Sequence, residues 1–309
     1  MAFTAQDVKT LREMTNVGMM DCKAALTATD GDMEKAVDWL REKGLAKAAK
    51  KADRVAAEGV AYAAVIDGVG VVIEVNSETD FAAKTDAFMD LVKNLAVVVA
   101  EQNPADVDAL KACKYPNSTL TVTEIMQEKV MSIGENMQIR RFQRFAENTS
   151  VAYVHMGGTH GVLVNLAVEG DIDATEVGKN VAMQIAAMNA KYWDKTLVPQ
   201  AEVDKEMSVQ LALMENDPKM ASKPAQVKEK IAQGKIAAFY KEMCLLQQEF
   251  VRGDLFKGDV AGYIADAAKK LGGKITFVDA IHYTKGEGIE KKVDDFAAEV
   301  AAQIAGAAK

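Results

Sequence analysis

The sequence predicts an α+β protein with helical regions at both ends and two small sheets between them. Two observations carry this prediction: an internal repeat of strand, turn, strand, loop and helix, and amphipathic helical patterns in both terminal regions. The 309 residues suffice for two or three cores. The predicted domains are 1–54, a three-helix docking domain; 55–145 and 146–285, two α+β subdomains; and 286–309, a C-terminal helical module.

The N-terminal region predicts three short helices. Val8, Leu11 and Met14 form an apolar stripe after residues 4–7, which resemble a capping box. A turn at 30–32 precedes a third helix with apolar residues at helical spacing. Because a bundle of this size is marginally stable alone, we expect it to act as a docking module on a larger body.

The middle of the chain repeats itself. Val-Ala-Tyr at 60–62 recurs at 151–153, and Gly-Val-Val-Ile at 70–73 matches Gly-Val-Leu-Val at 161–164. Both matches have an offset of 91 residues, and a helical pattern follows in each copy. The repeat therefore predicts two tandem subdomains, each with an apolar sheet face that its helix covers.

The remaining elements follow in order. Residues 201–250 predict two helices around a Pro-containing turn, which form either a projecting hairpin or part of a compact helical layer. Strand character returns over 272–283, before a turn at 286–288. Residues 291–305 predict a closing amphipathic helix that docks onto the protein itself or onto a partner.

Composition limits the class of partner. A net charge of −8 argues against a broad nucleic-acid surface, and we expect the basic residues of 43–54 and of Arg140, Arg141 and Arg144 to be solvated faces. No apolar run approaches the roughly 20 residues of a membrane helix. The N-terminus lacks a signal-peptide pattern, so the expected location is the cytoplasm.

The cysteines and histidines do not form the spacing of a metal, redox or nucleophilic site. We expect buried thiols, a partly buried structural His155, and neither a cofactor nor covalent catalysis. Glycines beside the first two histidines favour a hairpin turn over a phosphate cradle. These residues are Cys22, Cys113, Cys244, His155, His160, His282, Gly157, Gly158 and Gly161.

Residues 79–84, Thr-Asp-Phe-Ala-Ala-Lys, form the most informative segment for function. They follow an apolar run, 71–75, that predicts a buried strand, so Asp80 and Phe81 stand at a rigid strand end. The ring would act there as a wedge in another protein and the carboxylate as a competitor for a cation. Alternatively, Asp80 caps the next helix and Phe81 packs beneath it. The second copy of the repeat has Asp-Ile at this place, so the ring is not repeated.

Met19 and Met20 are a second candidate contact. Adjacent residues of a helix cannot both face one core, so one of the pair is expected to be exposed. Exposed methionines are common at protein interfaces because the side chain is flexible and polarisable.

Four separated segments, in the same order, resemble the bacterial elongation factor Ts family. They are residues 19–26, 76–84, 133–141 and 286–291, and the likeness extends over essentially the whole chain. The resemblance implies a ubiquitin-associated-type three-helix domain, a core of two repeated subdomains, a helical hairpin and a C-terminal helical module.

The resemblance also implies guanine-nucleotide exchange on elongation factor Tu, with displacement of its Mg²⁺ and release of GDP. It implies no cofactor, nucleic acid or membrane, and leaves open a complex with two copies of each factor. The implied Mg²⁺-displacing residues are Thr79, Asp80, Phe81, Ala82 and Ala83. The other implied partner contacts are Met19, Met20, Lys23, Ile133, Gly134 and His155.

The chain departs from the family pattern in places and leaves other functions to weigh. Thr159 and His160 stand where Arg-Ile is usual, Gln184 replaces a histidine, and Ala82 replaces a larger apolar residue. The alternatives are a non-catalytic scaffold for ubiquitin-like or other proteins and an enzyme that uses a cysteine. The second is disfavoured because no base accompanies the cysteines.

Overall fold

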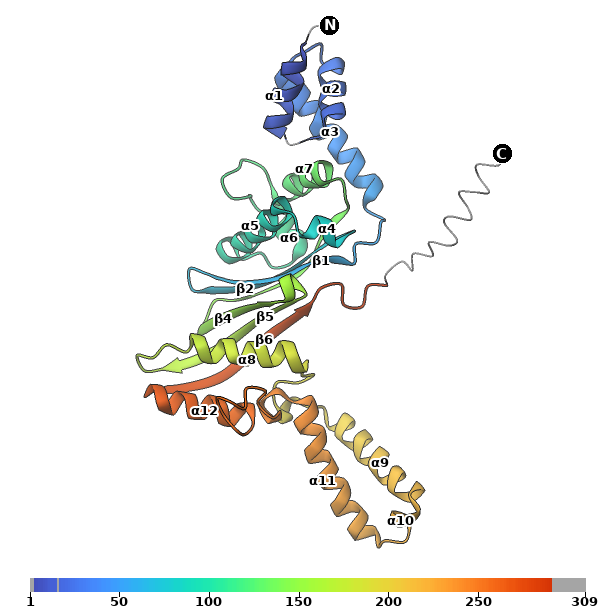
Figure 1. Cartoon of the computed structure of the whole chain (residues 1–309), viewed down its shortest axis with the longest axis vertical. Coiled ribbons are helices and arrows are strands. Elements are labelled where there is room, and N and C mark those ends of the chain that lie inside the picture. Colours follow the sequence, from blue (N-terminus) through green and yellow to red (C-terminus); the bar gives the residue numbers. More distant parts are fainter. Residues whose placement is uncertain (1–2, 16, 291–309) are drawn as a thin grey trace, which may run out of the picture.

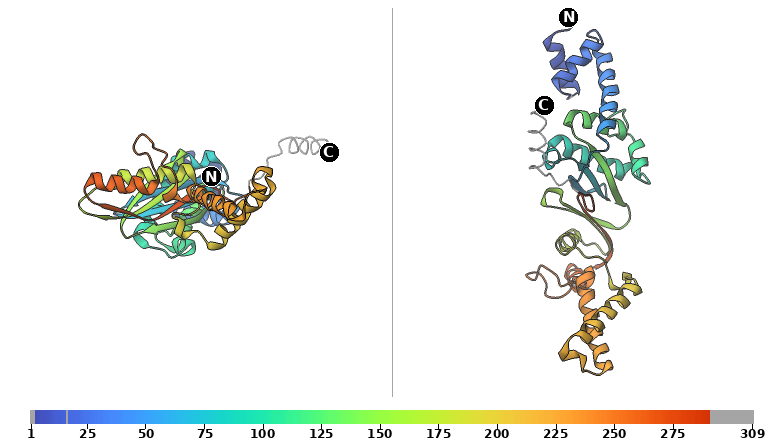
Figure 2. Two further views of the ribbon diagram at one scale, coloured as in Figure 1. Left: turned by 90° about the horizontal axis from the view of Figure 1, so that it is seen from below. Right: turned by 90° about the vertical axis from the view of Figure 1, so that its right-hand side faces the viewer.

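The computed structural model describes residues 3–15 and 17–290, with only the backbone of 45–50. The α+β class is confirmed, and the molecule is elongated: N-terminal helices at one end, sheets in the middle and a helical hairpin at the other end (Figure 1). The same order is visible from the side (Figure 2).

The helices are α1 (Ala5–Thr15), α2 (Met19–Ala28), α3 (Met33–Lys51), α4 (Asp80–Ala83), α5 (Asp86–Gln102), α6 (Val107–Ala112), α7 (Val122–Ile133), α8 (Thr175–Met188), α9 (Gln200–Asn216), α10 (Pro218–Ala221), α11 (Ala225–Met243) and α12 (Val260–Leu271). The strands are β1 (Glu58–Ile66), β2 (Val69–Ser77), β3 (Met137–Phe145), β4 (Thr149–His155), β5 (His160–Glu169) and β6 (Lys274–Thr284). The 3₁₀ turns are η1 (Met156–Gly158), η2 (Lys195–Leu197) and η3 (Leu245–Gln247).

The described strands form two three-stranded antiparallel sheets, β1-β2-β3 and β4-β5-β6, which pack face to face. Small and aliphatic side chains build the layer between them, among them Ala61, Ala63, Val72 and Leu163. Helices α5 and α7 cover the outer face of the first sheet, and α8 and α12 cover that of the second (Figure 1). Because the central strands β2 and β5 are buried on both faces, they read as nearly continuous apolar runs.

The predicted repeat is confirmed, since each sheet begins with a hairpin that leads into a covering helix. The two hairpins turn differently. Asp67 and Gly68 turn the first with φ values of 47° and 82°, the signs that a type I′ turn requires. Residues 156–159 turn the second through η1, which confirms the hairpin expected at the paired glycines. The prediction missed β3, α6, α7 and α12, which complete the sheets and their cover.

The predicted N-terminal helices are also confirmed. Thr4 N donates to Asp7 Oδ2 at 2.7 Å and Asp7 N donates to Thr4 Oγ1 at 3.3 Å, a reciprocal cap for α1. Leu11, Leu26 and Leu40 are buried at the centre of the bundle. Helix α3 continues without a break from the bundle to Lys51, so the connector to the sheets is helical.

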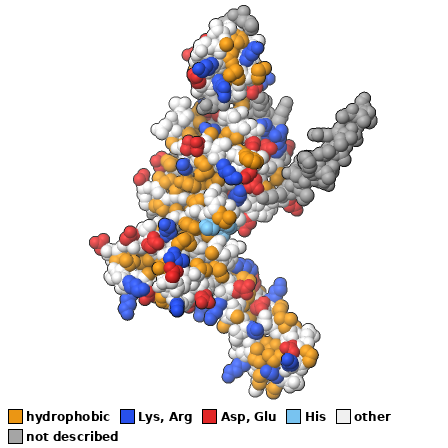
Figure 3. Space-filling model, viewed as in Figure 1, with side chains coloured by type: hydrophobic (Ala, Val, Ile, Leu, Met, Phe, Trp, Pro, Cys, Tyr) orange, Lys and Arg blue, Asp and Glu red, His pale blue; other side chains and the backbone are white. Residues whose placement is uncertain are grey.

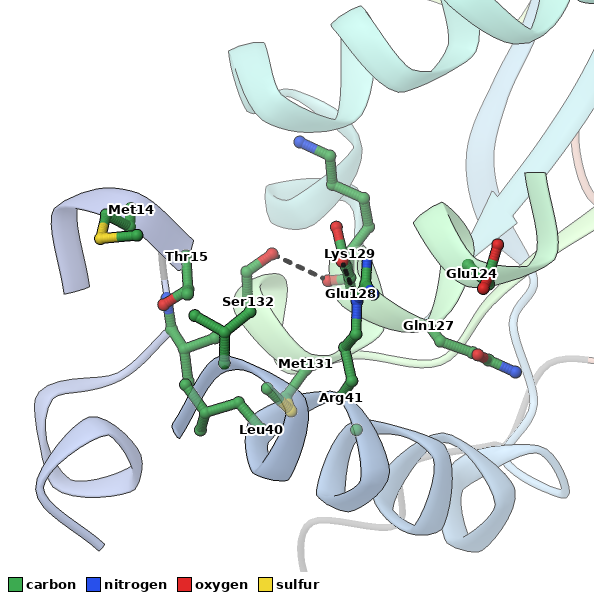
Figure 4. Close-up of a pocket in the computed structure, with 13 residues that line it drawn as sticks. Met14, Thr15, Leu40, Arg41, Glu124, Gln127, Glu128, Lys129, Met131 and Ser132 are labelled. Atoms are coloured by element: carbon green, nitrogen blue, oxygen red, sulfur yellow. Dashed lines mark hydrogen bonds and ion pairs between the residues drawn. The ribbon is translucent and has the colours of Figure 1, made fainter. Parts of the chain in front are cut away.

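Helix α7 attaches this bundle to the rest of the molecule. Met131 packs against the core of the bundle, and Arg41 Nε lies 3.4 Å from Glu128 Oε1. A cavity of about 300 Å³ remains between α7 and the bundle, with Met14 and Leu40 in its wall (Figure 4). This attachment sets the angle at which the bundle leaves the sheets.

The region 201–250 is a projecting hairpin rather than part of a compact layer. Helices α9 and α11 pack side by side and extend away from the sheets (Figure 1). The turn predicted at 286–288 is present, because Glu287 N donates to Thr284 O at 3.2 Å. The helix predicted over 291–305 lies outside the described residues. None of the helices that the structure describes is long and apolar enough to cross a membrane.

Gly161 tests how closely the two sheets must approach. A Cβ atom at this position would lie 2.8 Å from the carbonyl oxygen of Ala61, so we expect Gly161→Ala to lower the free energy of unfolding by about 1–3 kcal/mol. Gly234 in α11 has open space around it, and Gly234→Ala is expected to raise stability by about 0.5–1 kcal/mol. Urea unfolding measures both, and an unchanged midpoint for Gly161→Ala would contradict the close approach.

Candidate functional site

The loop after β2 forms α4, a single helical turn that presents Phe81 to solvent. The side chain of Thr79 caps this turn by accepting a hydrogen bond from Ala82 N at 3.2 Å. Ala82 and Ala83 are buried beneath it, whereas Phe81 is 80% exposed. The alternative in which Asp80 caps the helix and Phe81 packs beneath it is therefore wrong: the two alanines occupy the inward side of the turn.

Asp80 carries its charge at the surface beside this ring. Its Oδ2 accepts a hydrogen bond from Lys84 Nζ at 2.5 Å. That bond holds the pKa of Asp80 below its usual value, and the charge of Lys285 acts in the same direction. The carboxylate is thus ionised at neutral pH and lies next to an exposed aromatic ring.

Two glutamates fix α4 to the segment that follows α7. Glu135 accepts hydrogen bonds from Thr79 N at 3.0 Å and from Thr79 Oγ1 at 2.6 Å. In the opposite direction, Glu78 Oε1 accepts from Asn136 N at 2.6 Å. The predicted site segment 79–83 is therefore held to residues 135–136, which directly follow the predicted contacts at 133–134.

The residues at and just after the end of α3 bind the same two segments, at Glu78 and at 134–136. Asn136 Nδ2 donates to Arg54 O at 2.8 Å, Arg54 Nη1 lies 3.5 Å from Glu78 Oε2, and Lys51 Nζ donates to Gly134 O. Lys51 and Arg54 thus tether α3 to the base of α4, while Arg54 keeps more than half of its side chain in solvent.

The expected solvated face at Arg140, Arg141 and Arg144 is wrong. Arg140 and Arg141 lie against Glu74, which is fully buried in β2, and Arg144 Nη2 donates to Ala100 O at 3.0 Å. A β-bulge after Glu74 leaves Arg140 without a partner in the strand register. This extra residue allows two successive arginines to reach one carboxylate, although successive strand residues normally face opposite sides.

Glu74 was missed as a site residue, although a lone acid inside an apolar run is a visible signal. Arg141 Nε donates to its Oε2 at 2.6 Å, and Arg140 Nη1 and Gly286 N donate to its Oε1 at 3.0 Å and 2.7 Å. Burial of a carboxylate is tolerated only with such partners. The cluster joins the first sheet to the segment that follows β6.

That segment also reaches the turn between β4 and β5. Lys285 N donates to Thr159 O at 2.9 Å, and Lys285 Nζ donates to Glu58 Oε2 at 2.5 Å. Met156 in this turn is 72% exposed, and Gly158 approaches β1 so closely that a Cβ atom would lie 2.5 Å from Val60 Cγ1. The turn that carries His155 and Thr159 is therefore joined to β1 through Lys285.

The histidines form a row across the second sheet, at the waist of the molecule (Figure 3). His155 is half-buried, as expected, with Nδ1 2.8 Å from the Tyr153 hydroxyl. His160 Nδ1 lies 3.0 Å from His282 Nε2. Burial lowers the pKa of His282 to about 4, and the neighbouring His160 acts in the same direction. Across the described residues, no group of three or more His, Cys, Asp or Glu could hold a metal ion.

The cysteines lie in unreactive surroundings. Cys22 and Cys244 are fully buried, as expected, whereas Cys113 is only partly buried. Burial raises the pKa of the Cys22 thiol, and it raises that of Cys244 to about 11. Thiols held protonated in this way are poor nucleophiles at neutral pH.

The candidate residues of α2 form a separate surface. Cys22 and Leu26 face the bundle core, so Met19 and Met20 both point outward, with 51% and 76% exposure, and Lys23 is exposed as well. The expectation of one exposed methionine is thus exceeded. The structure does not bring these residues to α4, because the bundle occupies one end of the molecule (Figure 1).

Gln184 lies in α8, where the family pattern has a histidine. It is fully buried, and its amide donates to Gln248 Oε1 and to Glu249 O, both at 3.1 Å. Val251 N donates back to its oxygen at 2.8 Å. This departure therefore concerns the packing of the segment that follows the hairpin.

Comparison with known families identifies the class of protein. A family model described as Elongation factor TS matches residues 78–287, a span that begins just before α4 and ends in the segment bound by Glu74. The protein is a factor of translation elongation. Because the match covers more than half of the chain, the chain belongs to the elongation factor Ts family.

Phe81 and Phe88 form a matched pair for stability. We expect Phe81→Ala to change the free energy of unfolding by less than about 0.5 kcal/mol, because the ring is 80% exposed. Phe88 is fully buried in α5, and Phe88→Ala is expected to cost about 3–5 kcal/mol. Denaturant unfolding distinguishes the two, and a large loss for Phe81→Ala would place that ring in a core.

The histidine row predicts a pH dependence of stability. The pKa of His282 is about 4 in the folded protein and 6.5 as its reference value, so the unfolded chain binds more protons between these values. The free energy of unfolding should therefore fall as the pH decreases from about 6.5 to about 4. His282→Gln should flatten this part of the profile, and an equal slope in both proteins would contradict the assignment.

Proposed function

We propose that this protein is a guanine-nucleotide exchange factor for elongation factor Tu, and that α4 is the element that promotes GDP release. The observation that carries the proposal is the exposed Phe81 beside the ionised Asp80, on a turn fixed from two sides. Membership of the elongation factor Ts family supports the choice of partner.

The geometry of α4 supports a wedge mechanism. The side chain of Phe81 is available to a partner, and full burial of such a ring contributes about 1.5–3 kcal/mol. Glu135 and the Thr79 cap hold the turn, so little conformational entropy is lost when the ring enters another protein. The Asp80 carboxylate would then enter the surroundings of the Mg²⁺ that bridges the GTPase and the nucleotide phosphates. Loss of so large a local charge weakens nucleotide binding.

The exchange needs no covalent step. A factor that binds the nucleotide-free GTPase more tightly than the nucleotide-bound form must weaken nucleotide binding by the same factor. The protein would therefore act as a binding activator without a cofactor of its own, and GTP would rebind after GDP leaves. The side chains required are those that make contact, which agrees with the unreactive state of the buried cysteines.

Other surfaces would give the factor its hold on the partner. The exposed Met19, Met20 and Lys23 would dock the N-terminal bundle on the nucleotide domain. Gly134 is exposed beside α4 and would touch the same partner, with Ile133 and His155 contributing through their half-buried side chains. The long unbroken α3, followed by β1 at Glu58, supports a division between docking domain and core near residue 54.

Fluorescent GDP bound to elongation factor Tu tests the proposal directly. Micromolar protein should accelerate GDP release, and Phe81→Ala or Asp80→Ala should reduce the acceleration at least about tenfold, equal to about 1.4 kcal/mol of barrier. Leu271→Ala, which truncates another exposed apolar side chain, serves as the control. Release that does not respond to the wild-type protein would refute exchange activity and favour an interaction scaffold.

Met20→Ala tests the docking surface separately. Because Met20 is 76% exposed, the substitution should leave the stability of the free protein almost unchanged while weakening its complex with elongation factor Tu. Leu26→Ala in the core of the same helix should instead lower stability by about 2–5 kcal/mol. Calorimetric titration and thermal unfolding separate the effects, and comparable losses in both measurements for Met20→Ala would assign it to the core.

A further inference from the structure

We infer that Glu74 is a positioning residue of the exchange site: it holds the segment 284–287 so that Lys285 ties the turn after His155 to β1. This inference rests on the proposed exchange function and adds a residue that lies outside the contact surface. Glu74 is fully buried in β2, so it acts only through the groups that it binds.

The carboxylate of Glu74 gathers donors from three parts of the chain. Its Oε1 accepts from Asn76 Nδ2 at 3.2 Å, from Arg140 Nη1 at 3.0 Å and from Gly286 N at 2.7 Å. Its Oε2 accepts from Arg141 Nε at 2.6 Å. In a buried, low-dielectric position these charge-assisted bonds are strong, and the loss of one partner is expensive.

Arg140 and Arg141 also bind both ends of the segment 284–287. Arg141 Nη2 donates to Thr284 O at 3.3 Å and to Glu287 Oε2 at 3.1 Å, and Arg140 Nη2 donates to Glu287 O. The guanidinium of Arg141 also lies 4.1 Å from the centre of the Tyr283 ring. Glu74 thus fixes the segment directly at Gly286 and, through the arginines, on either side of it.

Lys285 connects this segment to β1 and to the turn between β4 and β5. Its backbone N–H binds Thr159 O, and its ammonium group binds Glu58 Oε2, so the side chain has a defined place. A displaced Lys285 would loosen the turn that carries His155, because both of its bonds hold that turn against β1.

Comparison of the two repeat copies separates this role from the needs of the fold. Asn165 occupies the position equivalent to Glu74, and a β-bulge follows it as one follows Glu74. An uncharged side chain therefore suffices for the bulge and the three-stranded sheet. The charge of Glu74 is specific to the copy that carries Phe81, and its additional partners lie in the segment 284–287.

Glu74→Gln keeps the size of the side chain and removes its charge. In the fluorescent-GDP assay with full-length protein, we expect kcat for exchange to fall about tenfold, because small misplacements at a site have effects of this order, while KM stays within about twofold. The amide of Gly286 should exchange with deuterium faster in the free protein. Gln184→Leu, which removes another fully buried polar side chain, should leave kcat unchanged.

A double-mutant cycle tests whether Glu74 acts through Lys285. Lys285→Met should lower kcat by a similar factor, and the double variant should lose no more than either single variant. Multiplied losses in the double variant, or an unchanged kcat in Glu74→Gln, would overturn the inference while wild-type exchange remains intact. If the wild-type protein itself does not accelerate GDP release, that result refutes the proposed function, and the inference about Glu74 is refuted together with it.

Discussion

The close face-to-face contact of the two sheets is the constraint on which the arrangement of this protein depends. A Cβ atom on Gly70 would lie 2.5 Å from Ser150 Cβ, and one on Gly161 would lie 2.8 Å from Ala61 O, so the sheets approach most closely at these two glycines. This proximity allows the turn of the second sheet to touch β1 of the first. It also allows one buried carboxylate, Glu74, to bind a segment more than two hundred residues further along the chain.

Local patterns in the sequence predicted the N-terminal helices, the hairpin and the repeated units, but missed β3 and the covering helices α7 and α12. Helical stripes identified the N-terminal bundle and the hairpin, and the 91-residue repeat identified both strand pairs. Strand β3 could not be found in this way, because its sequence, Met-Gln-Ile-Arg-Arg-Phe-Gln-Arg-Phe, carries three arginines whose partners lie elsewhere. The partners of Glu74 leave no local pattern either, because Arg140 belongs to β3 and Gly286 becomes a neighbour only when the second sheet packs on the first.

In the candidate site, too, local patterns were predicted and contacts between distant residues were not. The sequence placed Asp80 and Phe81 at a strand end but left two environments open for the ring, because its burial depends on which side of one helical turn faces the sheet. The repeat illustrates this dependence: Ile172, at the position equivalent to Phe81, packs against the second core, whereas Phe81 is 80% exposed. The bonds of Glu135 and Glu78 that fix the turn cross more than fifty residues and leave no local pattern.

The unbroken helix α3 has a consequence for the proposed binding of a partner through Met20 and Phe81. It connects the bundle that carries Met20 to the base of α4, where Lys51 and Arg54 tether it. Two contacts on one stiff body do not bind independently: once the first has formed, the second takes place at an effective concentration set by geometry, in the millimolar range even for short flexible linkers. A weak contact by a single phenylalanine can then be occupied for most of the lifetime of a complex. The partner leaves only when both contacts are broken together, because a single broken contact re-forms at the same effective concentration.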